Sequence, residues 1–148
     1  MRKVIIIILL GIFVLSGCNE NRANKNTSSS IHAYAGIVFE KVWLWGAAEG
    51  EYSKALKLNP KNAMAHRGMA MVYFEKQKYD SAIRHARRAL KLDRSWVKGY
   101  RFLGEAYEVK KNKRMAIDYY RKYLDKEKNL SRAGRKLIED KIRMLSLD

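Results

Sequence analysis

Apolar and small residues alternate with polar ones in a pattern that occurs three times along the chain. Three alanines mark the pattern at a constant spacing of 34 residues: Ala48, Ala82 and Ala116. An aromatic residue comes nine positions before each alanine, and a leucine comes eight positions after it: Phe39, Tyr73 and Tyr107, then Leu56, Leu90 and Leu124. A fixed period of this length indicates a tandem repeat. The pattern therefore predicts one small unit built three times.

Two more columns of the repeat hold small residues: Gly36, Ala70 and Gly104 in one, Ala55 and Ala89 in the other. Together with the stretches Tyr79–Ile83 and Tyr100–Tyr107, these columns resemble tetratricopeptide repeats over about residues 29–129. The resemblance implies an all-α fold of three tandem helix-turn-helix repeats, at residues 31–62, 63–96 and 97–130, in a short right-handed superhelical solenoid. The small residues would let neighbouring helices approach closely.

Polar residues between the repeats predict where helices begin. Pro60 ends the first repeat, and Asn62 and Ser95 are candidates to cap the helices that follow them. In the turn at residues 110–113, which holds no glycine, Asn112 is the residue expected to reverse the chain.

The first repeat departs from this pattern because Trp43, Leu44 and Trp45 fall where a polar turn belongs. Trp45 takes the place of Tyr79 in the next repeat, which favours packing between the first two helices. Trp43 is left with two alternatives, contact with a membrane interface near the tethered end or contact with a partner.

A last helix is predicted at residues 131–148. Its apolar residues recur at helical spacing, with charged residues between them: Leu137, Ile138, Ile142 and Leu145. Because the end of a repeat stack needs a polar outer face to stay soluble, we interpret this segment as a cap helix.

The first residues have the composition of a secretory signal. Arg2 and Lys3 supply positive charge, Val4–Val14 is an apolar run, and Leu15–Cys18 closes it. The run would reach about 18 Å as a helix, against a hydrocarbon core of about 30 Å, which is too short to span a bilayer. Leu-Ser-Gly-Cys resembles the lipobox of bacterial lipoproteins, which implies removal of residues 1–17 and palmitate and diacylglyceryl groups on Cys18.

Cys18 is the only cysteine in the chain, which excludes an internal disulfide. The lipoprotein resemblance makes it a covalent membrane anchor. Residues 18–30 are polar and are expected to form a flexible tether after the lipid. In a Gram-negative cell, Asn19 beside the lipidated cysteine would favour the periplasmic face of the outer membrane.

The chain is strongly basic, with a net charge of +16. Such charge often indicates nucleic acid, but export to the cell envelope removes that partner and leaves anionic lipid, envelope polymers and acidic protein segments. Four basic residues fall at i, i+3, i+4 and i+7 on the second helix of the middle repeat: Arg84, Arg87, Arg88 and Lys91. The resemblance places this basic face on the convex side, where it either binds an anionic surface or is merely solvated.

The family binds extended peptides or partner helices in a concave groove lined by the first helix of each repeat. By matching positions, the groove residues here are Ile37, Met64, Arg67, Met71, Phe74, Lys98, Arg101 and Glu105, with Ala33 and Glu108 beside them. Arg67 and Arg101 are one period apart and are expected to stack. The asparagine of the family's carboxylate clamp is replaced by Ile37, Met71 or Glu105, which argues against a chain-terminus ligand.

Catalytic chemistry has no support in the sequence. His32, His66 and His85 have no metal-ligand spacing, and no glycine-rich loop for phosphate is present. We expect no catalytic residue, metal or cofactor. The leading hypothesis is a non-enzymatic, lipid-anchored scaffold or adaptor of the bacterial cell envelope that binds a protein partner in pilus, secretion or cell-wall assembly. The alternative is a basic module that binds anionic lipid or envelope polymer through its convex face.

Overall fold

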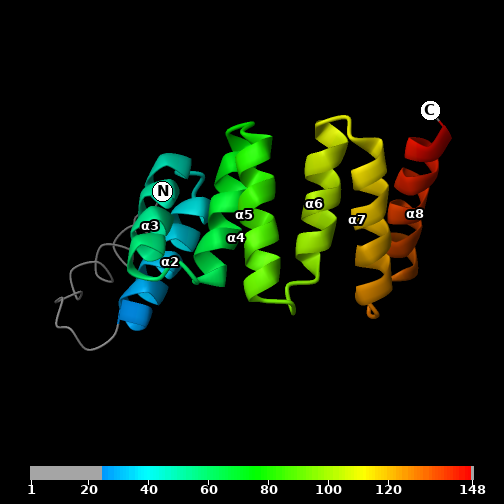
Figure 1. The fold of residues 1–148 in the computed structure, drawn as a ribbon. Helices are drawn as coiled ribbons and strands as arrows, with labels where there is room; N and C mark the ends of the chain where they lie inside the picture. Colours follow the sequence, from blue (N-terminus) through cyan, green and yellow to red (C-terminus); the bar gives the residue numbers. More distant parts are fainter. Residues whose placement is uncertain (1–24, 148) are drawn as a thin grey trace. The chain divides into compact units, whose positions relative to one another are not determined.

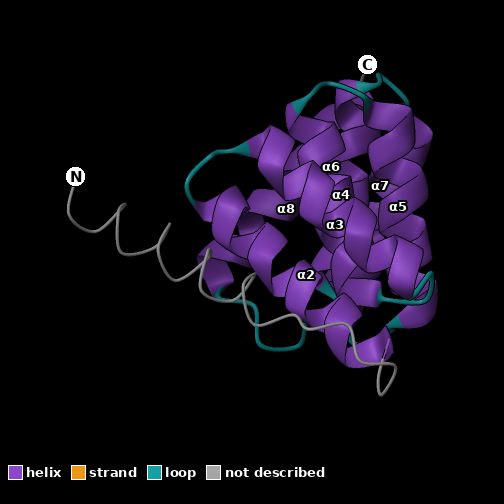
Figure 2. Ribbon diagram, turned by 90° about the vertical axis from the view of Figure 1, so that its left-hand side faces the viewer, coloured by secondary structure: helices purple, strands orange, loops and turns teal. Residues whose placement is uncertain are grey.

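The computed structural model describes residues 25–147, and this part of the chain contains seven α-helices and no strand (Figures 1 and 2). The all-α prediction is confirmed. The helices are α2 (Lys25–Lys41), α3 (Trp45–Leu58), α4 (Ala63–Glu75), α5 (Tyr79–Leu92), α6 (Lys98–Val109), α7 (Lys113–Lys126) and α8 (Arg132–Leu147). None of these helices is both long enough and apolar enough to span a bilayer.

The chain divides after Leu92 into two compact units. In the first unit, α2 pairs with α3 and α4 pairs with α5, while α4 also packs against both α2 and α3. In the second unit, α6 pairs with α7, and α8 packs against α7. Each pair forms a helical hairpin, as Figure 1 shows.

The turn inside each helix pair has the same backbone in all three repeats. Trp43, Gln77 and Lys111 take left-handed φ values of 66°, 58° and 58°. The amide after each of them donates to the carbonyl of the aromatic residue five positions earlier, with N–O distances of 3.0, 2.8 and 2.9 Å at Phe39, Tyr73 and Tyr107. This is the Schellman arrangement that ends a helix, here without glycine. The 34-residue period therefore extends to individual backbone hydrogen bonds.

Of the two expected helix caps, the one at Asn62 forms and the one at Ser95 does not, and Asn112 forms a cap that was not predicted. Asn62 accepts from the Ala65 amide at 3.0 Å and Asn112 from the Met115 amide at 3.2 Å, so both cap the helices that follow. Chain reversal at residues 110–113 was assigned to Asn112, but Lys111 holds the left-handed position. Ser95 does not cap α6, because its amide and hydroxyl both bond to Asp93 Oδ1, at 2.9 and 2.5 Å.

The alanine column lies in the core. Ala48, Ala82 and Ala116 are completely buried. In the first unit Ala48 belongs to a cluster of buried side chains: Ala33, Ala48, Tyr52, Ala55, Ala65, Met69 and Val72. In the second unit the buried cluster is Ala116, Tyr120, Tyr123 and Ile138. Close packing of small and aromatic residues holds each hairpin together, as the sequence predicted.

Tyrosine rings explain the glycines of the small column. A Cβ atom at Gly36 would lie 2.5 Å from the Tyr52 ring, and one at Gly104 would lie 2.6 Å from the Tyr120 ring. Both distances are shorter than van der Waals contact, so the ring can lie against the helix backbone only where the side chain is absent. Tyr52 also lies over Gly68, where a Cβ would come within 2.0 Å.

The first helix begins earlier than predicted. Residues 25–30 were expected to belong to a flexible tether, but they form the start of α2. Ser29 is fully buried, donates to the Ala55 carbonyl at 2.8 Å and accepts from Asn62 Nδ2 at 2.8 Å. The tether prediction is therefore wrong for residues 25–30, because these polar side chains satisfy their hydrogen bonds inside the fold. Residues 18–24 lie outside the described part.

The cap helix is less polar on its outer side than expected. Ile138 is buried, and Ile142 and Leu145 pack against the second cluster. Leu137, however, is 59% exposed, and Met144 and Leu147 are exposed as well. Because Leu137 and Met144 are seven residues apart, they share a face that neighbours the buried one. The expectation of a polar outer face is wrong at these positions.

Candidate functional site

The predicted groove residues of the first unit differ in how accessible they are. Ile37 and Met64 are half-buried and pack against the first cluster. Met71 is 37% exposed, and Arg67 and Phe74 are half-buried. These last three residues lie at i, i+4 and i+7 of α4 and therefore share one side of that helix, which we call the α4 surface. Ala33, placed beside the groove from sequence, is completely buried and offers no surface.

The α4 surface combines a cation with apolar side chains. Burial lowers the pKa of Arg67 below the ordinary arginine value, although the group stays charged at any physiological pH. The Phe74 ring packs edge-on against the Tyr79 ring, with centroids 5.4 Å apart. That contact holds Phe74 in one orientation beside the exposed Met71. A partly desolvated guanidinium next to a thioether and an aromatic ring suits a ligand with both apolar and acidic groups.

The groove residues of the second unit are more polar. Lys98 is exposed, and Arg101 and Glu105 form an ion pair with an N–O distance of 3.7 Å. Glu105 thus neutralises part of the positive charge expected here. Arg67 lies in the first unit and Arg101 in the second, so the stacking of these two residues stays a prediction.

Glu108 was placed beside the groove from the sequence, but its carboxylate forms hydrogen bonds within the second unit. Lys141 Nζ lies 3.0 and 2.9 Å from its two carboxylate oxygens, and the Tyr120 hydroxyl donates to one of them. Burial alone would raise the pKa of Glu108, but the hydrogen bonds from Tyr120 and Lys141 outweigh it and lower the pKa. Tyr52 donates to Glu40 in the same way, at 2.7 Å, and Glu108 and Tyr120 stand two periods after that pair. This repeated spacing is the signal in the sequence for the contact between Glu108 and Tyr120.

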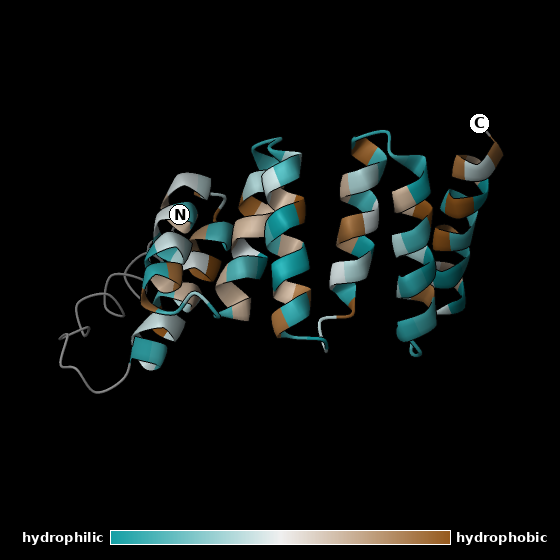
Figure 3. Ribbon diagram, viewed as in Figure 1, coloured by the Kyte–Doolittle hydropathy of each residue, from teal (hydrophilic) through white to brown (hydrophobic). Residues whose placement is uncertain are grey.

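The basic face is exposed along one side of α5. Arg84, Arg87, Arg88 and Lys91 all reach solvent, while the opposite side of the helix buries Ala82, Ile83, Ala86, Ala89 and Leu90. Figure 3 shows α5 as largely hydrophilic on the side toward the viewer. At equivalent positions of the other repeats, Lys54 bonds to Glu51 at 2.7 Å and Lys122 to Asp118 at 2.6 Å. Positive charge is therefore densest on the middle repeat.

The two tryptophans of the first turn have opposite environments. Trp45 packs against the first cluster, as predicted. Trp43 is 77% exposed and Leu44 is 46% exposed. The turn also lies at the far end of α2 from residue 25, along a helix of 17 residues or about 26 Å.

The histidines are structural in this fold. His32 Nδ1 lies 2.7 Å from the buried Glu51 carboxylate. His66 and His85 face each other, with Nδ1 atoms 3.0 Å apart, and the Tyr73 ring lies 5.4 Å from that of His85. Within residues 25–147, no three His, Cys, Asp or Glu side chains come together as a metal site.

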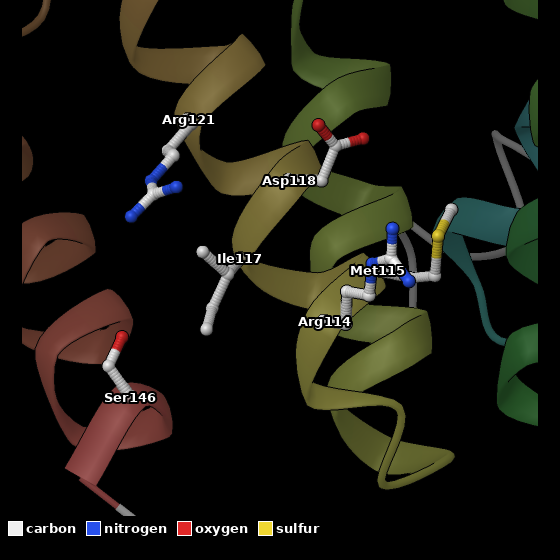
Figure 4. Close-up of a pocket in the computed structure, with 6 residues that line it drawn as sticks. All are labelled: Arg114, Met115, Ile117, Asp118, Arg121 and Ser146. Carbon is white, nitrogen blue, oxygen red and sulfur yellow. The ribbon is translucent and has the colours of Figure 1, made fainter.

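An open pocket between α7 and α8 was not foreseen from the sequence. It is lined by Arg114, Met115, Ile117, Asp118, Arg121 and Ser146. In Figure 4, Ile117 and Arg121 point toward the helix that carries Ser146. Arg114 and Arg121 are seven residues apart and therefore share one side of a helix, and this spacing is the sign of the pocket that the sequence contains. Asp118 forms an ion pair with Lys122, so the pocket has mixed charge rather than the features of an anion site.

Comparison with known proteins identifies the repeat. A family model described as tetratricopeptide repeat matches residues 44–95 and 68–130. The chain belongs to the tetratricopeptide repeat family. Proteins of this fold generally act as interaction scaffolds rather than enzymes. Cys18 and the predicted signal peptide at residues 1–17 lie outside the part of the chain that the structure describes.

Curated relatives share this repeat over short parts of their length. Small glutamine-rich tetratricopeptide repeat-containing protein 2 of Saccharomyces cerevisiae is 32% identical over 54% of this chain and 23% of its own. The Hsp70-Hsp90 organising protein of Plasmodium falciparum is 28% identical over 82% of this chain and 22% of its own. The chain therefore spans less than a quarter of either relative.

Solved structures agree on the fold. The tetratricopeptide repeat domain of Arabidopsis OM64 is 25% identical, with a TM-score of 0.73, and covers 82% of this chain and 98% of that domain. The first such domain of Spaghetti (RPAP3), bound to an HSP90 peptide, is 22% identical, with a TM-score of 0.71, and covers 82% and 93%. The predicted fold is thus confirmed as a tetratricopeptide repeat with an additional C-terminal helix.

Proposed function

We propose that this protein is a membrane-anchored adaptor that binds a peptide or helix of a partner protein on the first helices of its repeats. It acts by binding and not by catalysis. The observation that carries the proposal is the α4 surface of a tetratricopeptide repeat, with Arg67, Met71 and Phe74 on one side of one helix. Two related folds were solved in complexes, one with an HSP90 peptide and one, from yeast Sti1, with pHsp70, and these complexes support a peptide ligand.

The chemistry of the α4 surface narrows the ligand. Burying an apolar side chain of the ligand against Met71 and Phe74 would stabilise the complex by about 1.5–3 kcal/mol. Arg67 would add a charge-assisted hydrogen bond to an acidic group. Because Met71 stands where the family's carboxylate clamp has asparagine, we propose an internal segment with an apolar and an acidic residue, rather than a free carboxyl terminus.

The cellular setting of the proposal comes from the amino-terminal sequence. Leu15–Cys18 resembles a lipobox, and a lipid on Cys18 would hold the repeats close to a membrane of the bacterial envelope. Asn19 favours the periplasmic face of the outer membrane in a Gram-negative cell. A partner from pilus, secretion or cell-wall assembly fits this location.

Photocrosslinking in the native host tests the adaptor. A photoreactive side chain is placed at Met71 or Phe74, and a matched control at Arg88 on the basic face. We expect discrete protein adducts from the α4 positions and none from Arg88. Adducts with lipid or polymer only, or the same adducts from all three positions, would contradict the adaptor.

A second candidate function rests on the basic face. Arg84, Arg87, Arg88 and Lys91 are exposed on one side of α5, and each basic residue near an anionic membrane contributes about 1 kcal/mol. Reversing the charges of Arg84, Arg87 and Arg88 should abolish surface binding, which should also weaken as salt rises. Replacing Met71 and Phe74 by alanine should leave surface binding intact and abolish partner capture.

A further inference from the structure

The turn between α2 and α3 displays two apolar side chains that the fold does not need there. Trp43 is 77% exposed and Leu44 is 46% exposed. The equivalent turns have the same left-handed backbone at Gln77 and Lys111, which shows that polar residues satisfy this geometry. We call Trp43 and Leu44 the apolar turn.

Neither backbone conformation nor core packing accounts for this tryptophan. The left-handed region is unfavourable for a bulky side chain, so the turn would form more easily with a smaller residue. The core of the first unit instead receives Trp45 and Phe39, from the two sides of the turn. The Trp43 ring is left to meet something outside the described fold.

We propose that the apolar turn inserts into the interfacial layer of the membrane that carries the lipid anchor. The proposal rests on the proposed anchoring through Cys18. Tryptophan is enriched at membrane interfaces, because its ring is apolar and its N–H can bond to headgroups or water. Leucine beside it adds apolar area that reaches the acyl boundary.

The length of the chain allows both contacts at once. The turn lies at the end of α2, about 26 Å along the helix from Lys25. Lys25 is the seventh residue after Cys18, and a chain of seven residues spans at most about 25 Å. With α2 upright on the membrane, the fully extended chain falls just short of this distance. A tilt of the helix shortens the distance required, so that Cys18 and Trp43 can reach the same leaflet.

Charges near the apolar turn balance one another. The charged residues that adjoin the two turns of the first unit in sequence, taken with the ion-pair partner of Lys76, are Lys41, Lys76 and Lys78, with Glu40, Glu49 and Glu75. Lys76 forms an ion pair with Glu49, and Glu40 accepts a hydrogen bond from Tyr52. These three positive and three negative side chains sum to zero, so together they are neither attracted to headgroups nor repelled by them. Insertion of the apolar turn is therefore expected to be insensitive to salt, unlike binding through the basic face.

Quenching of tryptophan fluorescence by brominated lipid tests this contact. The full chain is expressed in a bacterial host, extracted from its membranes and reconstituted into phosphatidylcholine–phosphatidylglycerol vesicles with brominated acyl chains. Trp43→Gln copies the second repeat and keeps Trp45 and Trp96 in place. A matched control carries Trp43→Gln together with Lys61→Trp, which moves the exposed ring to the turn at the opposite end of α3.

We expect bromolipid to quench the unaltered chain about threefold more than either variant, with no change when salt is raised to about 0.5 M. Equal quenching of the unaltered chain and Trp43→Gln would overturn the proposal, as would quenching of the Lys61→Trp control to the unaltered level.

Flotation of the same vesicles reports on the anchor separately. A chain that floats without quenching at Trp43 overturns the insertion alone, and a chain that does not float overturns the anchoring as well. If bromolipid does not quench Trp43 in the unaltered chain, and a photoreactive side chain at position 43 crosslinks to a protein, the apolar turn binds a protein partner instead.

Discussion

The Nδ1 atom of His85 donates a hydrogen bond to the Nδ1 atom of His66 across 3.0 Å. The direction follows from the other nitrogen of His66, which lies 3.1 Å from the Pro60 carbonyl and must carry a hydrogen to bond there. In a neutral ring, Nδ1 of His66 is then the acceptor. Protonating His66 would turn two N–H groups toward each other. The hydrogen bond in this form therefore requires His66 to stay neutral. Once His66 is protonated, the bond persists only if His85 carries its hydrogen on Nε2 and accepts at Nδ1.

This pair predicts loss of stability in mild acid. Burial, with the charges of His66 and Arg84, lowers the pKa of His85 to about 4, and burial also lowers the pKa of His66. The unfolded chain then binds more protons than the folded one, so stability is complete above about pH 7 and falls between about pH 6.5 and 4. Because both rings are partly exposed, we expect a loss of about 1–2 kcal/mol, measured by urea unfolding across this range.

The control for the histidine pair is His85→Gln, which removes the titrating group and keeps a polar side chain. Its free energy of unfolding should vary less with pH between about 6.5 and 5.5, where most carboxylates are ionised in both the folded and the unfolded chain. An unchanged slope in His85→Gln would contradict this origin of the acid sensitivity.

Gly104 and Tyr120 form a coupled pair that a double-mutant cycle can measure. Gly104→Ala places a Cβ 2.6 Å from the Tyr120 ring and should destabilise the protein by about 1–3 kcal/mol. In a Tyr120→Ala background, which copies Ala70 and Ala86 of the second repeat, the same substitution should cost little. Thermal or urea unfolding of the four proteins gives the coupling energy, and additive effects would disprove the steric origin.

Trp43→Gly should make the protein more stable. Glycine takes the left-handed conformation without steric cost, and the exposed ring contributes little packing, so we expect a gain of about 0.5–1 kcal/mol in urea unfolding. Gln77→Gly and Lys111→Gly are matched controls with nearly the same φ. A loss of stability at position 43 alone would show that the Trp43 ring supports the fold.

Ser29→Ala distinguishes a folded start of α2 from a tether. The substitution removes the bond to the Ala55 carbonyl and leaves Asn62 Nδ2 without its acceptor, at a cost of about 1–2 kcal/mol in urea unfolding. Ser30→Ala is the control, because the Ser30 hydroxyl bonds only within its own helix, to the Asn26 carbonyl at 3.0 Å. If both substitutions change the free energy of unfolding equally and negligibly, residues 25–30 belong to a flexible tether and not to the fold.

The repeat columns could be predicted from sequence because they record packing, which recurs with the period. Ala48, Ala82 and Ala116 stand where two helices touch, so the same small residue is needed each time. Asn62 was predictable as a cap for a similar reason, since the local side chain satisfies the local backbone.

Other features depend on contacts that no local pattern records. Residues 25–30 are polar enough to be a tether, and only the distant acceptor at Ala55 gives Ser29 a buried place. Glu108 has the composition of a groove residue until Lys141, 33 positions later, reaches it. The exposure of Leu137 beside the buried Ile138 depends on how α8 is rotated against α7, which spacing alone does not fix.

The three turns at Trp43, Gln77 and Lys111 have one further consequence. Their backbone hydrogen bonds are the same although an indole, an amide and an amine occupy the left-handed position. Reversal of the chain is thus independent of the side chain displayed at its apex. The side chain at each turn can change during evolution without altering the two helices that the turn connects. A dye or crosslinker can likewise be attached at any of the three positions with the same small effect on the backbone.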